Sequence, residues 1–158
     1  IQAIKKVMNG GNNDASKAGR RSESNFKNQN RHFNILLVED NEVNQKLAIH
    51  LLSKFGYLLT IAENGRTACD KFMKNPAEYD LILMDIQMPV MDGIEATRCI
   101  RKYEARIDST RAIPIIAMTA NVLKGDREAY LDAGMDDYLS KPIKKEEIVK
   151  ILEQWEKR

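Results

Sequence analysis

Residues 81–93 read LILMDIQMPVMDG, and this stretch decides the fold class. Its first four residues are all apolar, which is typical of a central parallel strand that is buried on both faces. Asp85 follows directly, and the Met-Pro and Asp-Gly pairs after it are typical of turns. The stretch therefore predicts a buried strand that ends in a carboxylate and leads into a helix capped by Asp92.

Short apolar runs and longer amphipathic stretches alternate on both sides of this strand, which predicts five βα units around a parallel sheet. Asn64 is expected to cap the second helix, and the stretch that ends at Gly134 is expected to form an exposed, loosely packed helix. The expected strands are residues 35–38, 57–62, 81–84, 113–118 and 138–140. Apolar side chains recur on one face of the first helix (Val43, Leu47, Leu51, Phe55) and of the last (Ile148, Ile151, Leu152, Trp155).

The first 33 residues differ in composition from the rest of the chain. They hold seven Lys and Arg against two acids, a net charge of +5, which leaves −3 for the remainder of a chain whose net charge is +2. Residues 9–31 are too polar to offset the entropy of ordering. We therefore expect a flexible basic linker over residues 1–33, with the end of an upstream helix at residues 1–8, and one domain over residues 34–158.

Several classes of protein are excluded for this domain. Its mildly acidic charge argues against nucleic-acid binding, and its apolar runs are far shorter than the roughly 20 residues of a membrane span. Cys69 and Cys99 lack metal-ligand spacing, so we expect reduced thiols. We expect a cytoplasmic domain that contacts neither nucleic acid nor membrane.

Charged and hydroxyl residues follow four of the five predicted strands. Glu39 and Asp40 follow the first, Asp85 the third, Thr119 the fourth and Lys141 the fifth. In an open parallel sheet, ligands bind beyond the carboxyl ends of the strands. Three carboxylates gathered there would repel one another, and an oxygen-seeking cation such as Mg²⁺, which keeps phosphate oxygens among its ligands, relieves that repulsion.

The same residues fit phosphoryl transfer. Asp85 is the candidate nucleophile, because a carboxylate can form an aspartyl phosphate. Lys141 supplies a point charge, and the Thr119 hydroxyl can donate to a phosphoryl oxygen. Taken singly, each residue has an ordinary explanation as a loop charge or a strand end. Their conjunction at one sheet edge is what predicts the site.

Four motifs, LLVEDNEVNQ, LILMDIQMPVMDG, IIAMTAN and YLSKP, resemble the receiver domain of response regulators in this order and at about its spacings. The resemblance covers residues 34 to about 157. It implies a flavodoxin-like (βα)5 fold, a doubly wound parallel sheet with strand order 2-1-3-4-5. It also implies that Asp85 is the phosphoacceptor and that Asp40 and Asp85 ligate Mg²⁺, for which Mn²⁺ can substitute. By the same resemblance, Glu39, directly or through water, and the main-chain carbonyl of Gln87 would complete the metal site.

Further roles follow from the same resemblance. Thr119 and Lys141 would contact the phosphoryl group, and Tyr138 would turn inward as Thr119 moves toward it. Gln87 and Asn121 would flank the path of the attacking water and tune dephosphorylation. The bond between Lys141 and Pro142 would be cis.

The motifs most resemble the C-terminal receiver of a hybrid histidine kinase, and the separation of 34 positions between Asp85 and Thr119 indicates a long connection. The resemblance implies a domain that catalyses its own phosphorylation and dephosphorylation. Its phosphoryl donor would be a phosphohistidine of a histidine kinase core or of a histidine phosphotransfer protein, to which the group can also be passed on. Phosphorylation would switch partner binding, and we expect a monomer or a weak phosphorylation-dependent dimer.

Other interpretations of the sequence compete with this one. A haloacid-dehalogenase-type phosphatase needs a second Asp two residues after the nucleophile, where this chain has Gln87. A flavodoxin would meet repulsion between its phosphate and Glu39-Asp40. The surviving alternative is a pseudo-receiver, an interaction module that works without phosphorylation. It predicts the same partner affinity with and without a phosphate mimic.

Overall fold

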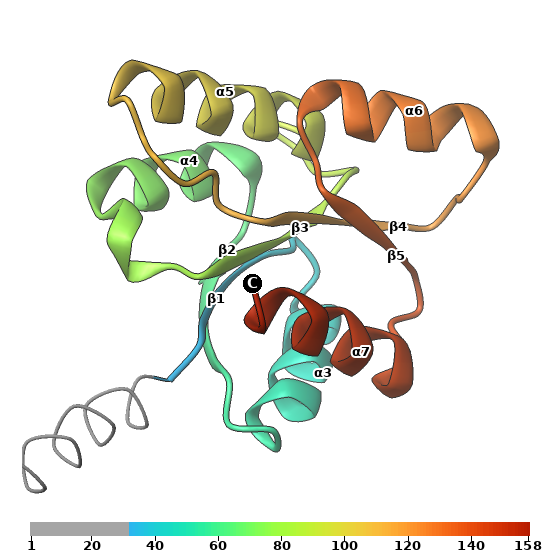
Figure 1. Cartoon of the computed structure of the whole chain (residues 1–158). Coiled ribbons are helices and arrows are strands. Elements are labelled where there is room, and N and C mark those ends of the chain that lie inside the picture. Colours follow the sequence, from blue (N-terminus) through green and yellow to red (C-terminus); the bar gives the residue numbers. More distant parts are fainter. Residues whose placement is uncertain (1–31) are drawn as a thin grey trace, which may run out of the picture. The chain divides into compact units, whose positions relative to one another are not determined.

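The structure, a computed structural model, describes residues 32–158. The predicted linker and the predicted helix end at residues 1–8 lie outside this range, apart from His32 and Phe33. The described part is built on a parallel sheet of five strands in the order β2-β1-β3-β4-β5 (Figure 1). The predicted fold class and strand order are confirmed, and the strand ends differ from the predicted ones by two residues at most. The strands are β1 (Asn34–Val38), β2 (Leu58–Ala62), β3 (Leu81–Asp85), β4 (Ile115–Thr119) and β5 (Asp137–Ser140).

Within residues 32–158, five α-helices cover the two faces of the sheet. Three of them, α4, α5 and α6, lie over one face, and α3 and α7 lie over the other (Figure 1). No helix in this range is long and apolar enough to cross a membrane. The helices are α3 (Glu42–Ser53), α4 (Gly65–Lys74), α5 (Gly93–Arg106), α6 (Lys124–Ala133) and α7 (Lys145–Glu156), and a short 3₁₀ helix, η2 (Pro76–Glu78), precedes β3.

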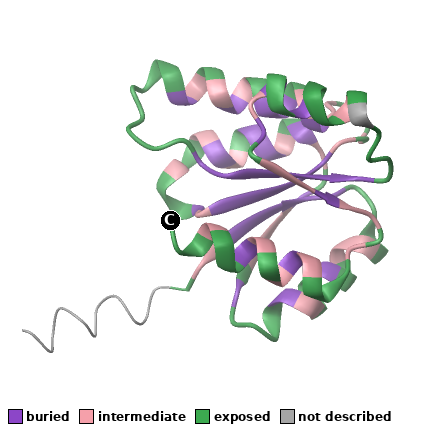
Figure 2. Ribbon diagram, turned by 45° about the vertical axis from the view of Figure 1, so that its right-hand side comes forward, coloured by how far each residue is buried: buried purple, intermediate pink, exposed green. Residues whose placement is uncertain are grey.

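The two layers of helices bury both faces of the central strands. Along β1, Leu36 and Val38 pack toward α4 and α5, whereas Ile35 and Leu37 pack toward α3 and α7. Every residue of β3 and β4 is buried (Figure 2). The apolar run before Asp85 is therefore a central strand, as predicted.

The buried face of α3 differs from the face that the sequence pattern marked. Ala48 and Leu52 pack on the sheet, whereas Val43 is 73% exposed and Leu47 and Phe55 are also exposed. The helix carries two apolar stripes. The longer side chains that recur at every fourth residue, such as Val43 and Leu47, form the outer stripe, and Ala48 and Leu52 form the inner one. The small side chain of Ala48 allows the helix to lie close to the sheet. An apolar stripe on α3 is consequently left facing outward.

Other local predictions are confirmed. The Asn64 side chain accepts a hydrogen bond from the Thr67 amide at 2.9 Å and so caps α4. Asp92 caps α5 in the same way. The described side chains of α6 are mostly exposed, and α7 buries Ile148 and Leu152. The Lys141–Pro142 peptide bond is cis.

The connection from α5 to β4 is held by a partly buried ion pair. The Glu104 carboxylate accepts a hydrogen bond from the Ile113 amide at 2.7 Å and lies 2.7 Å from the Arg101 guanidinium. Arg101 also pairs with Asp136 at 2.9 Å. Residues 107–112 between these anchors are exposed. The long connection is thus fixed at its two ends, and the residues between them are exposed.

Candidate functional site

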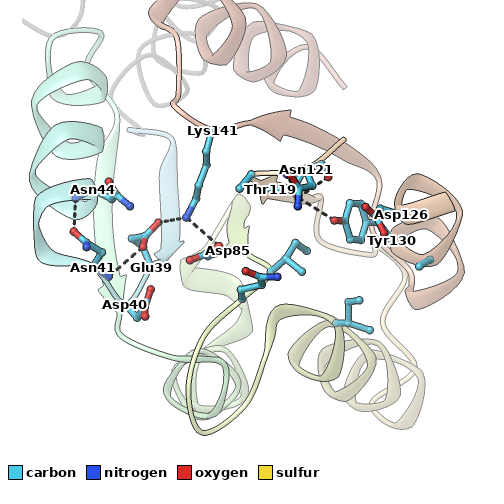
Figure 3. Close-up of a pocket in the computed structure, with 15 residues that line it drawn as sticks. Glu39, Asp40, Asn41, Asn44, Asp85, Thr119, Asn121, Asp126, Tyr130 and Lys141 are labelled. Atoms are coloured by element: carbon cyan, nitrogen blue, oxygen red, sulfur yellow. Dashed lines mark hydrogen bonds and ion pairs between the residues drawn. The ribbon is translucent and has the colours of Figure 1, made fainter. Parts of the chain in front are cut away.

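A pocket of about 480 Å³ opens at the carboxyl ends of β1, β3 and β4 (Figure 3). The strands end in polar side chains there because each apolar strand has just left the core. The structure brings together almost the whole predicted site. The predicted residues that line the pocket are Glu39, Asp40, Asp85, Gln87, Thr119, Asn121 and Lys141.

Three carboxylates meet in this pocket. Glu39 and Asp85 are buried and Asp40 is exposed, yet each offers an oxygen within 4.8 Å of the others. Glu39 is fixed at both ends, because its side chain accepts a hydrogen bond from the Asn41 amide at 3.1 Å and its carbonyl accepts one from Gln45 at 2.7 Å. A fixed set of three oxygen donors fits a hard divalent cation such as Mg²⁺.

Lys141 reaches this cluster from the end of β5. Its main-chain amide donates to the Thr119 carbonyl at 2.8 Å, which continues the pairing of β4 with β5. Its Nζ lies 2.8 Å from Glu39 Oε2 and 3.0 Å from Asp85 Oδ1 (Figure 3). One ammonium group therefore serves two buried carboxylates.

The pKa values of these groups reflect the sharing of one ammonium group between two carboxylates. Burial, together with the charges of Glu39 and Asp40, raises the pKa of Asp85 to about 6 despite the hydrogen bond from Lys141. Burial also acts to raise the pKa of Glu39, but hydrogen bonds from Lys141 and the Asn41 amide outweigh it and lower that pKa. The pKa of Lys141 is raised, since its two carboxylate partners outweigh the effect of burial. Of the two buried acids in this pocket, Asp85 is therefore the one whose charge is less well compensated.

The Thr119 hydroxyl points toward α6. Its Oγ1 donates to the Asn121 carbonyl at 2.9 Å, accepts from the Asn121 amide at 3.2 Å, and lies 3.0 Å from the Tyr130 hydroxyl (Figure 3). Thr119 and Tyr130 are both buried. The hydroxyl predicted to meet a phosphoryl group is thus engaged elsewhere in this structure.

Tyr138 is the one predicted site residue that does not line the pocket. It lies half-buried on β5, with the Arg127 guanidinium 5.5 Å from the centre of its ring. Its switch role stays a prediction. The lining residues that sequence reasoning missed include Asn44, Asp126 and Tyr130. Tyr130 had a signal, because it is the only aromatic residue of a helix that is otherwise largely polar.

Comparison with known proteins assigns a family. The model of the response regulator receiver domain matches residues 35–153. The chain is 49% identical over 112 residues to hybrid signal transduction histidine kinase I of Dictyostelium discoideum. The aligned segment covers 69% of this chain and 6% of that protein. The chain is 47% identical over 110 residues to the aerobic respiration control sensor protein ArcB of Escherichia coli strain K12, covering 70% and 13%. The chain thus spans a small part of these curated relatives.

Solved structures agree. The receiver domain of sensor histidine kinase PA1611 from Pseudomonas aeruginosa PAO1, which holds a magnesium ion in its active-site cleft, has a TM-score of 0.69 and 47% identity over 79% of this chain and 98% of that one. The receiver domain of Ssk1 from Saccharomyces cerevisiae, crystallised with the histidine phosphotransfer protein Ypd1, has a TM-score of 0.71 and 34% identity over 78% and 88%. This chain therefore belongs to the response regulator receiver domain family, and its residues 35–153 form a receiver domain of two-component phosphorelay signalling.

Proposed function

We propose that Asp85 accepts a phosphoryl group from the phosphohistidine of a partner protein in a Mg²⁺-dependent reaction. One observation carries this proposal. Asp85 is a buried carboxylate with a lysine ammonium at 3.0 Å and two further acids beside it, and it lines a pocket open to solvent. A nucleophile, a counter-charge and a cation site in one place are what phosphoryl transfer requires.

The step exchanges one bond to phosphorus for another. An Asp85 carboxylate oxygen attacks the phosphorus, the bond from phosphorus to the histidine nitrogen breaks, and the imidazole leaves with the electron pair. Lys141 balances charge on the phosphoryl oxygens, and the Thr119 hydroxyl turns from α6 to donate to one of them. Glu39, Asp40, Asp85 and the Gln87 carbonyl would hold Mg²⁺, which supplies further neutralisation of that charge.

The outer stripe of α3 suits the approach of the partner. Leu47 lies beside the site, because it lines a hollow of about 320 Å³ with Lys141, Pro142 and Ile143. Val43, one turn earlier on α3, is also exposed. The Ssk1 receiver forms a complex with a histidine phosphotransfer protein, and we propose a partner of that kind, docked over Val43 and Leu47.

Several finer features belong to the same proposal. The kinase core of a hybrid histidine kinase is a second donor, with residues 1–33 as the linker to it. Tyr138 follows the movement of Thr119, while Gln87 and Asn121 tune the lifetime of the phosphorylated state. Mn²⁺ substitutes for Mg²⁺, and the domain is a monomer or a weak phosphorylation-dependent dimer.

The chemistry is tested by intact mass after incubation with acetyl phosphate. We expect one phosphoryl adduct that needs Mg²⁺, disappears with chelator and is absent from Asp85→Asn. Absence of an adduct in the native protein would count against receiver chemistry and favour the interaction module.

The docking surface is tested separately with phosphorylated Ypd1 as donor. We expect Leu47→Asp to slow transfer about tenfold while leaving the acetyl phosphate reaction unchanged, because Leu47 is not among the residues proposed to hold the phosphoryl group or Mg²⁺. Leu131→Asp, at an exposed leucine on α6, is the matched control. Equal transfer rates in the two variants would place the partner elsewhere.

A further inference from the structure

Tyr130 places a hydroxyl group inside the pocket that the proposed reaction does not use. The residue belongs to α6, is 7% exposed, and its hydroxyl oxygen lies 3.0 Å from Thr119 Oγ1. Thr119 has one hydroxyl hydrogen and donates it to the Asn121 carbonyl. Tyr130 is therefore the donor in the bond between the two hydroxyl groups.

This bond opposes the movement that phosphorylation demands. To donate to a phosphoryl oxygen on Asp85, Thr119 must withdraw its hydrogen from Asn121 and turn its oxygen away from Tyr130. The Tyr130 hydroxyl is then left in a buried place without its acceptor, which is unfavourable unless α6 also shifts.

The packing of α6 makes Tyr130 a sensitive point for such a shift. Of the α6 residues whose side chains are described, only Tyr130 and Ala133 are buried. A helix with so small a buried face is held largely by those contacts. A change at the Tyr130 hydroxyl can therefore alter the position of the whole helix.

We propose that Tyr130 is a positioning residue that holds Thr119 in its unphosphorylated arrangement and couples phosphorylation of Asp85 to α6. The proposal rests on the proposed function, since it assumes that a phosphoryl group forms on Asp85. It adds a contact distinct from the one predicted for Tyr138, because the partner of Thr119 is here a residue of α6 itself.

A double-mutant cycle tests the proposal with beryllofluoride as the phosphoryl analogue. Its apparent affinity in Mg²⁺ would be measured by NMR for the native protein, Tyr130→Phe, Thr119→Ala and the double variant. We expect Tyr130→Phe to bind about fivefold more tightly than native, the equivalent of one ordinary hydrogen bond. In the Thr119→Ala background the same change should have no effect. The amide resonances of α6 should also move less on binding in Tyr130→Phe than in the native protein.

A matched control separates this effect from the general loss of a tyrosine hydroxyl. The Tyr103 hydroxyl donates to the Met73 carbonyl at 3.1 Å, away from the pocket, so Tyr103→Phe should leave the affinity unchanged. An unchanged affinity in Tyr130→Phe, or the same gain in both Thr119 backgrounds, would overturn the role of Tyr130 alone. A native protein that binds no beryllofluoride in Mg²⁺ would overturn the proposed function with it.

Discussion

Asp85 lies where burial and two neighbouring acids oppose its charge, while one ammonium group, shared with Glu39, favours it. Its pKa of about 6 in the folded protein stands above the 3.8 of an unperturbed carboxyl group. Between pH 3.8 and about pH 6, the folded state therefore binds more protons than the unfolded state. The charged carboxylate therefore lowers the free energy of unfolding above pH 6, and this penalty fades as the pH falls toward 4.

Removing that charge should stabilise the metal-free protein. We expect Asp85→Asn to raise the free energy of unfolding by about 1–2 kcal/mol at pH 7.5, because the buried carboxylate is gone. The advantage over native should shrink between pH 7 and pH 5, where native Asp85 takes up a proton. Urea denaturation in the presence of a chelator measures both the gain in the free energy of unfolding at pH 7.5 and its change with pH. Asp108→Asn, in the exposed connection, is the control, and an advantage that does not vary with pH would contradict the assignment.

Gly93 shows how closely the backbone approaches the site. A Cβ at this position would overlap the main-chain carbonyl oxygen of Asp85. We expect Gly93→Ala to lower the free energy of unfolding by about 3 kcal/mol, since the overlap involves backbone that cannot step aside. Denaturation measures the loss. Gly125→Ala, in open space on α6, should instead be neutral or gain up to about 1 kcal/mol.

At the level of single residues, the sequence predicted the site residues at and just after the strand ends and missed those that come from helices, such as Asn44 on α3 and Asp126 and Tyr130 on α6. Glu39, Asp85 and Lys141 could be placed because each directly follows an apolar strand, and parallel strands end at one edge. Tyr130 could not be placed in the same way. Its position depends on how α6 rotates over the sheet, and the polar sequence of that helix sets its rotation only weakly.

Among the elements, α3 shows where periodicity is ambiguous. Val43 and Leu47 form one apolar stripe and Ala48 and Leu52 another, and hydrophobicity alone favours the stripe with the longer side chains. The other stripe packs on the sheet, because the small side chain of Ala48 permits close packing. The presence of the helix was therefore predictable, whereas its buried face was decided by tertiary contacts.

The two stripes of α3 should respond differently to truncation. We expect Leu52→Ala to cost about 3 kcal/mol of the free energy of unfolding, because it opens a cavity against the sheet. Leu47→Ala, at a side chain that is 44% exposed, should change that free energy by less than about 0.5 kcal/mol. Thermal or urea denaturation compares the two. Equal losses in the two variants would show that the Leu47 side chain is packed in the core.

For the molecule as a whole, the proposed cation site would link Mg²⁺ binding to folding. The three acids that favour a cation come together only in the folded chain, so Mg²⁺ should stabilise it. At a hundredfold excess over its dissociation constant, the gain is about 2.7 kcal/mol. We expect the melting temperature to rise by several degrees in MgCl₂ and by much less in Asp40→Asn, whose acid is exposed. An equal rise in NaCl of matched ionic strength would show screening instead.

The exposed connection at residues 107–112 also divides the reacting groups between two lengths of chain. The acids at the ends of β1 and β3 precede it, whereas Thr119 and Lys141 follow it. Cleavage there would leave two fragments, each with an open strand edge: β3 on one and β4 on the other. Because Ile82 lies opposite Ile115 in the paired register, these edges are complementary. On the proposed mechanism neither fragment accepts a phosphoryl group alone, so an adduct on Asp85 would signal that the two fragments had met.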